Sequence, residues 1–284
     1  MTARFLCALW FLAAGCLQAA QNPPAPASSN PTGAELREIL KKSVDEDNLN
    51  FEPSRNYVYI EDKVTRFVDA QGKATKSSSE THERMVLYGE PYERLIRRDG
   101  KPLSAKQERA EREKLDKETA RRRQEPAEAK AKRLETGRQK SLACNTEFVD
   151  GFHFRLLGVE SVNGRPAWKV AADPIPGGPP RCKAMKQIEM FRLTIWIDQE
   201  DGKWSRFEAD NVAPVSAGGI IARAPAGALH VTFELTRREA GVWLPAHAQV
   251  RSNVKLMLVT TLHEEIEFTY SAYRKFQSES KIVE

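Results

Sequence analysis

The last third of the chain, Phe191–Phe276, alternates apolar and polar residues in short runs that end at turn-forming residues. A period of two places successive side chains on opposite faces of a strand, so each run predicts a strand with one buried face. The acidic segment Asp198–Lys203 ends in Asp-Gly-Lys and predicts a hairpin turn, and Glu239–Gly241 predicts another. We therefore expect an antiparallel meander in this third. The runs are Phe191–Ile197, Trp204–Phe207, Leu229–Thr236, Val242–Arg251, Val254–Leu262 and Ile266–Tyr270.

The first half of the chain repeats this organisation. Asn56–Val68 is rich in Tyr, Val and Ile and predicts a strand, and Thr75–Leu87 predicts a second one after the turn Ala70–Lys73. Gly89–Pro91 breaks that strand, and Tyr92–Arg97 forms the next. Because 40% of the residues are apolar and 29% are charged, a packed core is feasible and global disorder is excluded.

One amphipathic helix precedes the first strand. Thr32 and Glu35 have the spacing of a capping box, which predicts a helix start. Apolar residues then recur at helical spacing to about Asp47, and we expect this face to cover one side of the sheet. Its polar side carries too many acidic residues for a helix that lies on a membrane surface. The apolar positions are Leu36, Ile39, Leu40 and Val44.

The stretch Ser104–Lys140 consists almost entirely of Ala, Glu, Lys, Arg and Gln, with Pro126 dividing it. It predicts a long solvated helix or a helix pair. The basic excess of the chain lies here, because Lys101–Lys140 carries a net charge of +6 and the formal charge of the whole chain is +5. A run of this kind is typical of a solvated face, and the alternative is an arm, 104–140, that contacts an anionic membrane surface.

The N-terminus has the features of an export signal. Arg4 precedes ten apolar residues, Phe5–Ala14, which are too few to span a bilayer as a helix but suit a signal peptide over 1–20. Two processing outcomes stay open: ordinary cleavage near Ala19 or Ala20, or acylation of Cys16 in a lipobox-like Ala-Ala-Gly-Cys. The Pro/Ser-rich residues 21–32 predict a linker. We expect the protein in the periplasm or at the outer membrane.

Two cysteines, Cys144 and Cys182, lie beyond the signal. In an exported chain this pair favours a disulfide, whereas a redox site would show closer pairing such as C-x-x-C. Between them, Phe148–Leu157 and Ala167–Ala171 predict strands, and Pro174–Pro180 predicts an irregular connection.

No motif in the chain indicates catalysis. His263-Glu264-Glu265 lacks the second histidine of a zinc protease motif, and Asp198–Gly202 lacks the alternating ligands of an EF-hand loop. Neither a G-x-S-x-G nor a phosphate-binding loop is present. We therefore expect a protein that is not an enzyme and that uses no cofactor, no metal and no nucleic acid.

An apolar ligand is the chemistry that the strands suit best. Val254–Leu262 is apolar on both faces, so both must be covered. Either the helix and an opposing sheet cover them, or one face lines a groove for an apolar ligand. The residues that alternation places on apolar faces, and that we expect to contact such a ligand, are Ile195, Ile197, Phe233, Leu256, Leu258 and Phe268.

The order of these parts, together with Trp196-Ile197-Asp198, Asp201-Gly202-Lys203-Trp204, Val231-Thr232-Phe233-Glu234-Leu235 and Gly241-Val242-Trp243-Leu244-Pro245, resembles the outer-membrane lipoprotein-sorting (LolA/LolB-like) superfamily. The resemblance implies an α+β fold: a strongly curved antiparallel sheet, or open half-barrel, with an amphipathic helix on its concave side. It would form a single domain over 33–278, and the charged helical insertion 103–141 departs from the pattern. Several members carry acyl chains in the cavity.

These observations lead to two hypotheses for function. The first is non-catalytic binding or carriage of a lipid or lipoprotein acyl group in the bacterial cell envelope. The alternative is a structural or sensory envelope protein whose basic helical arm contacts a partner or a membrane surface.

Overall fold

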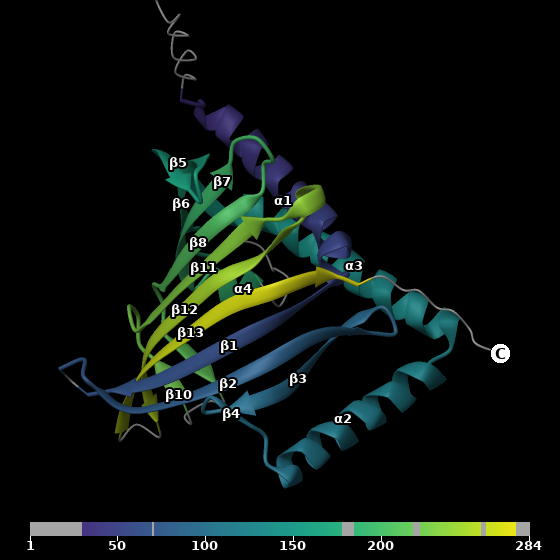
Figure 1. The fold of residues 1–284 in the computed structure, drawn as a ribbon. Helices are drawn as coiled ribbons and strands as arrows, with labels where there is room; N and C mark the ends of the chain where they lie inside the picture. Colours follow the sequence, from purple (N-terminus) through teal and green to yellow (C-terminus); the bar gives the residue numbers. More distant parts are fainter. Residues whose placement is uncertain (1–29, 70, 178–184, 218–221, 257–259, 277–284) are drawn as a thin grey trace, which may run out of the picture. The chain divides into compact units, whose positions relative to one another are not determined.

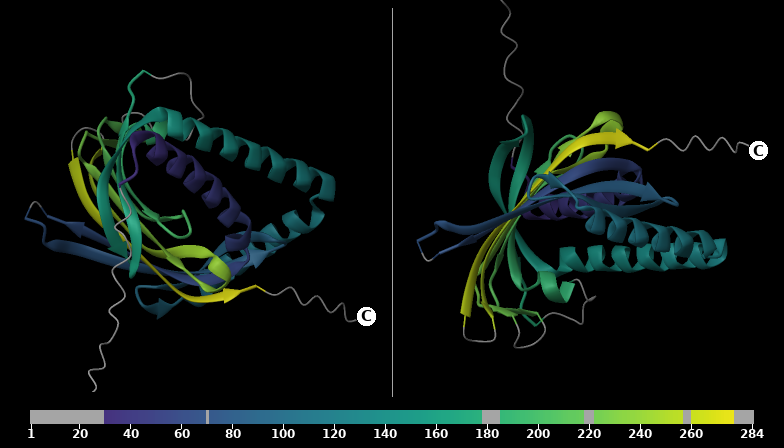
Figure 2. Two further views of the ribbon diagram at one scale, coloured as in Figure 1. Left: turned by 90° about the horizontal axis from the view of Figure 1, so that it is seen from above. Right: turned by 60° about the horizontal axis from the view of Figure 1, so that its bottom comes forward.

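The architecture is one antiparallel sheet with helices against one of its faces (Figure 1). The structure is a computed structural model that describes residues 30–69, 71–177, 185–217, 222–256 and 260–276. Contacts within the chain group Pro31–Glu284 into one unit. The 13 strands follow the order β4-β3-β2-β1-β13-β12-β11-β8-β7-β6-β5, with β10 and β9 attached beside β12. The predicted curved antiparallel half-barrel with a helix on its concave side is confirmed (Figure 2).

Most strands lie where alternation predicts them. Antiparallel neighbours that follow one another in the chain need only short turns, which is why the sheet is built almost entirely from hairpins. The strands are β1 (Tyr57–Val68), β2 (Ala74–Leu87), β3 (Glu90–Arg98), β4 (Lys101–Pro102), β5 (Phe152–Val162), β6 (Arg165–Pro174), β7 (Phe191–Asp198), β8 (Trp204–Asn211), β9 (Val215–Ala217), β10 (Ala222–Ala224), β11 (Leu229–Arg237), β12 (Trp243–Leu256) and β13 (Thr260–Lys275).

Helix α1 (Gly33–Arg55) begins at the predicted capping box: the Thr32 side chain accepts from the Glu35 N–H, and the Glu35 carboxylate accepts from the Thr32 N–H. The expected end near Asp47 is wrong, because the helix continues to Arg55. The apolar periodicity stops at Val44, but adding residues to an existing helix needs no buried face. Pro53 lies in the last turn, where a missing donor costs least.

The charged stretch forms the predicted helix pair, α2 (Ala105–Gln124) and α3 (Ala127–Gly151), separated at Pro126. Below we call α2 and α3 together the arm. The strand expected over Phe148–Leu157 starts only at Phe152, because Phe148 and Val149 belong to the last turn of α3. Phe148 and Val149 at the end of the helix and Phe152 at the start of the strand are all buried in the core.

A second boundary error concerns the expected strand Val254–Leu262. Val254–Leu256 is the end of β12, and Thr260–Leu262 is the start of β13. Leu256 is paired with Thr260 across a hairpin. Residues 257–259 lie outside the described residues, and the segment contains no Gly or Pro that would mark a turn in the sequence. The short helix α4 (Met185–Ile188), the 3-10 turn η1 (Glu239–Gly241) and strands β9 and β10 complete the described elements.

The core lies between α1, the end of α3 and strands β5 to β8. Leu40 of α1 and Ile195 and Ile197 of β7 are fully buried there. The two helices run side by side over this part of the sheet (Figure 2), and Arg37 of α1 forms an ion pair with Asp150 of α3. The predicted signal 1–20, Cys16 and Cys182 lie outside the described residues, as does the Cys144 side chain, so the predicted disulfide and lipidation stay predictions.

Candidate functional site: an uncovered apolar face beside charged strands

The strand register places three of the six expected ligand residues in one row across the concave face. Ile195 is paired with Phe207, Phe207 with Phe233, Phe233 with Ala248, and Ala248 with Phe268. Directly paired side chains on one face lie about 5 Å apart. The row is therefore a continuous apolar path from β7 to β13.

Helices cover only the first part of this path. Ile195 and Ile197 are fully buried in the core together with Leu40, so a ligand reaches them only if α1 moves. Trp204 closes the same region, because its indole N–H donates to the buried Ser43 hydroxyl of α1 at 3.0 Å. In the half of the sheet formed by β5 to β8, side chains fill the space between helix and sheet.

The path continues beyond the core onto a surface that we call the open face. Phe207 packs against the core and stacks on Phe233 with ring centroids 5.5 Å apart. From Phe233 onward the large apolar side chains are partly exposed to solvent and belong to none of the buried clusters, although Ala248 between Phe233 and Phe268 is buried. The open face consists of Phe233 on β11, Val250 and Val254 on β12, and Leu262, Ile266 and Phe268 on β13.

The remaining expected ligand residues lie at the end of the β12–β13 hairpin. Leu256 occupies a register position on the same face as Ala248 and is the last residue of β12. Leu258 lies outside the described residues. Five of the six expected residues, all except Leu258, thus share one face by register, and two of these, Phe233 and Phe268, are partly exposed there.

The apolar path ends abruptly between β13 and β1. Phe268 is paired with Lys63, and Lys63 with Glu80 of β2. Ile266 is paired with Thr65, and Thr65 with Ser78. In these two rows the concave face is therefore apolar through β13 and polar from β1 onward.

The alternation of β1 explains this change. Val58, Ile60 and Val64 lie at even positions, whereas the concave positions are odd and, in the middle of the strand, include Glu61, Lys63 and Thr65 between the aromatic residues Tyr59 and Phe67. The middle of this strand thus presents polar side chains on the side of the sheet that is apolar in β13. Sequence reasoning missed this polar border, and the signal was present in the phase of the alternation in β1, which can be assigned to a face only once its pairing with β13 is known.

A group of titratable side chains occupies the border beside Lys63. The rings of Tyr59 and Tyr270 meet edge to face at 5.8 Å, and burial raises the pKa of Tyr59 to about 12. Burial, and secondly the charge of Glu93, raise the pKa of the Glu61 carboxyl. His82 Nδ1 lies 3.8 Å from Glu61 Oε1 and has no hydrogen-bond partner.

The arm is fixed to the outer strands by Arg122. The guanidinium of Arg122 donates to the carbonyls of Leu87, Glu90 and Pro91 at 2.9, 3.0 and 3.1 Å, and its side chain is only 10% exposed. It also lies over the Tyr92 ring at 5.8 Å. A second contact comes from α3, where Arg133 donates to Glu90 at 2.8 Å and holds the pKa of that carboxyl below its usual value. The turn between β2 and β3 is thus held by both helices of the arm.

The acidic segment after β7 has a structural role. Burial alone would raise the pKa of Asp198, but the two Arg165 hydrogen bonds at 2.6 and 2.8 Å hold it below its usual value. Asp198 Oδ1 also accepts the backbone N–H groups of Glu200 and Asp201, which closes the hairpin. The predicted turn is confirmed, and its carboxylates are occupied by protein donors.

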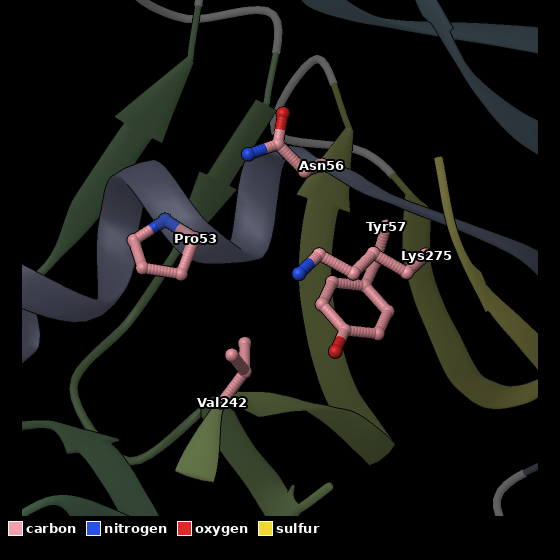
Figure 3. A pocket seen from close by; sticks show the side chains of 5 residues that line it. All are labelled: Pro53, Asn56, Tyr57, Val242 and Lys275. Carbon is pink, nitrogen blue, oxygen red and sulfur yellow. The ribbon is translucent and has the colours of Figure 1, made fainter. Parts of the chain in front are cut away.

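A shallow pocket of about 340 Å³ lies at the end of α1, and none of the open-face residues lines it (Figure 3). Pro53 and Asn56 come from the helix end, and Tyr57, Val242 and Lys275 complete the lining. Only five residues line it, so it is a weaker candidate than the open face.

Within the described part of the chain, no group of three or more His, Cys, Asp or Glu side chains is arranged to hold a metal ion. The helices described here include none that is both long and apolar enough to cross a membrane.

Comparison with known proteins gives matches at the level of structure. No family model matches the chain, and no curated protein matches its sequence. An outer membrane lipoprotein-sorting protein domain from Vibrio parahaemolyticus matches at 10% identity and a TM-score of 0.34, covering 85% of this chain and 95% of its own. A LolA superfamily protein from Nitrosomonas europaea matches at 11% identity and a TM-score of 0.31, covering 84% and 92%.

The lipoprotein LppX of Mycobacterium tuberculosis matches at 11% identity and a TM-score of 0.29, covering 85% of this chain and 96% of its own. The matches thus include the superfamily that the sequence resembles. At identities and TM-scores this low they carry no residue role over to this chain.

Proposed function

We propose that this protein binds the acyl chain of a lipid or lipoprotein on its open face, in the periplasm or at the outer membrane, without covalent chemistry. The single observation that supports this function is the continuation of the apolar row past the core. Phe233 and Phe268 follow Ile195 in register, but no described helix buries them. Partly exposed apolar side chains on a concave sheet provide a surface for an alkyl chain, at about 0.8 kcal/mol per buried methylene.

The curvature of the sheet favours a chain-shaped ligand. An alkyl chain that lies across β11, β12 and β13 would contact Phe233, Ala248 and Phe268 in turn, because paired residues on neighbouring strands lie about 5 Å apart. It would extend the apolar core outward without displacing α1. The sequence-predicted residues Ile195 and Ile197 would then support the site from the core, and Leu256 and Leu258 stay candidates at its end.

Isothermal titration calorimetry with 1-dodecanol and dodecanoate tests this function, with native mass spectrometry of the freshly purified protein as a second readout. We expect saturable binding of both probes and co-purified lipid. Phe268→Ala should weaken both affinities about tenfold, since it removes one aromatic contact with the chain. Thr269→Ala is the matched control, because Thr269 is the next residue, is exposed and faces the opposite side of the sheet. Absence of binding by the unaltered protein would refute the function.

One observation supports the second function, contact of the arm with an anionic membrane surface. Helix α2 spans 20 residues and buries none of them, yet Arg122 fixes it to the sheet. A helix held in place with no buried face presents a defined surface to a partner. Its exposed cations include Lys106, Arg109 and Lys117.

Co-sedimentation with vesicles of pure phosphatidylglycerol or pure phosphatidylcholine tests this second function. We expect binding to the anionic vesicles alone, weakened by raised salt. The triple variant Lys106→Gln, Arg109→Gln, Lys117→Gln should lose it, and equal binding by the variant would contradict the proposal.

A further inference from the structure

Lys63 lies at the point where the open face meets the polar strands. It is paired in register with Phe268 on one side and with Glu80 on the other. Its neighbours on the same face of β1 are Glu61 and Thr65. A ligand whose alkyl chain lies on the open face and extends past β13 would place its polar end beside Lys63.

Among the charges at this border, Lys63 differs in forming no direct ion pair, although its charge acts on the nearby Glu61 carboxyl and works against the rise in pKa that burial causes there. Arg98 donates to Glu80 at 2.8 Å, and Arg84 donates to Glu93 at 2.9 Å, so both arginines are neutralised by the protein. Lys63 forms no ion pair or hydrogen bond with any residue in the described part of the chain. Because its two neighbouring strands supply no free carboxylate at its register position, the ammonium group is available to a ligand.

The surroundings of Lys63 are chemically asymmetric along β1. On one side lies the Glu61 carboxyl, whose Oε1 is 3.8 Å from His82 Nδ1 and on which the charge of Lys63 also acts. On the other side lie Thr65 of β1 and Ser78 of β2, two hydroxyl-bearing residues that are paired in the strand register. Hydroxyl donors together with an ammonium group are the donors that a carboxylate or phosphate accepts from. Repulsion from Glu61 would direct an anion toward the hydroxyl side.

We infer that Lys63, with Thr65 and Ser78, binds the anionic head of an amphiphile whose alkyl chain lies on the open face. This inference rests on the proposed function and narrows it: the ligand is a free amphiphile with a carboxylate or phosphate head, rather than a neutral acylated cysteine. Ile266, which is paired with Thr65, and Phe268, which is paired with Lys63, lie on the apolar side of the boundary. The head would thus contact β1, and the alkyl chain would contact the adjacent strand β13.

Three probes with the same 12-carbon chain separate the head from the chain: dodecanoate, dodecyl phosphate and 1-dodecanol, each titrated below its micelle concentration into the purified protein. We expect the unaltered protein to bind at least one anionic probe about tenfold more tightly than the alcohol. Comparison of the two anions identifies the preferred head, carboxylate or phosphate.

Lys63→Gln should remove the advantage of the anionic probe and leave the affinity for 1-dodecanol unchanged, whereas Lys63→Arg should retain most of it. Lys73→Gln is the control, since Lys73 is an exposed lysine in the turn between β1 and β2. Anionic and neutral probes bound equally well by the unaltered protein, or weakened equally by Lys63→Gln, would overturn the inference while leaving the proposed function intact. Failure of all three probes to bind would instead refute the proposed function.

Discussion

The two halves of the concave face differ in what covers them. On β5 to β8 the apolar side chains lie under α1 and α3, and Leu40 and Ile195 are fully buried. On β11 to β13 the apolar row continues, but Phe233 and Phe268 keep part of their surface exposed. The same alternation therefore builds a core in one half and a candidate binding surface in the other. The comparison teaches that an apolar strand face indicates burial in general and does not identify what buries it.

The largest expected effect tests this difference through stability. Leu40→Ala should lower the free energy of unfolding by about 3 kcal/mol, because it leaves a cavity in a fully buried site. Phe268→Ala removes a larger side chain but should cost about 1 kcal/mol, since water already reaches part of the ring. Urea denaturation measures both. Equal losses would mean that the two halves are covered alike.

An intermediate effect concerns the Arg122 hydrogen bonds that fix the arm to the turn between β2 and β3. Arg122→Gln should cost about 1 to 2 kcal/mol, because three backbone carbonyls of the β2–β3 turn lose their donor. Hydrogen exchange should speed up in α2 and at this turn, with little change in β5 to β8. Arg123→Gln is the control, since Arg123 is exposed beside it. Unchanged hydrogen exchange in the Arg122 variant would show that these hydrogen bonds do not stabilise the contact between the arm and the sheet.

The smallest effect concerns the polar border and depends on pH. The pKa of Glu61 is raised by burial, so folding favours the protonated carboxyl. Its contribution to stability is present below the unfolded-state pKa and is lost as the pH rises through the higher folded-state pKa. Glu61→Gln should therefore be more stable than the unaltered protein at pH 8, by about 1 kcal/mol or less, and the difference should vanish at pH 3.

Urea midpoints at the two pH values measure this difference. Glu113→Gln, at an exposed position of α2, should show no such pH dependence. A Glu61 variant that is less stable than the unaltered protein at pH 8 would indicate that the carboxylate makes a favourable contact in the folded state.

Much of the fold could be predicted from the sequence, because the signals are local. Alternation located most of the strands, the Thr32–Glu35 capping box located the start of α1, and Pro126 divided the arm. The errors occurred where a local pattern has two interpretations. Phe148 and Val149 fit a strand or a helix end, and the apolar run Val254–Leu262 contains no residue that marks its turn.

By itself the sequence determined the period of each segment, and with it which residues share a face of a strand. Only the tertiary structure decided which faces meet, because pairing joins strands that are far apart in the chain. The pairing of β1 with β13 sets Lys63 beside Phe268, 205 residues later in the chain, and so turns an ordinary charged strand into the boundary of an apolar surface. Coverage was decided in the same way: α1 is long enough to bury Ile195 but lies over one half of the sheet, which leaves Phe233 and Phe268 partly exposed.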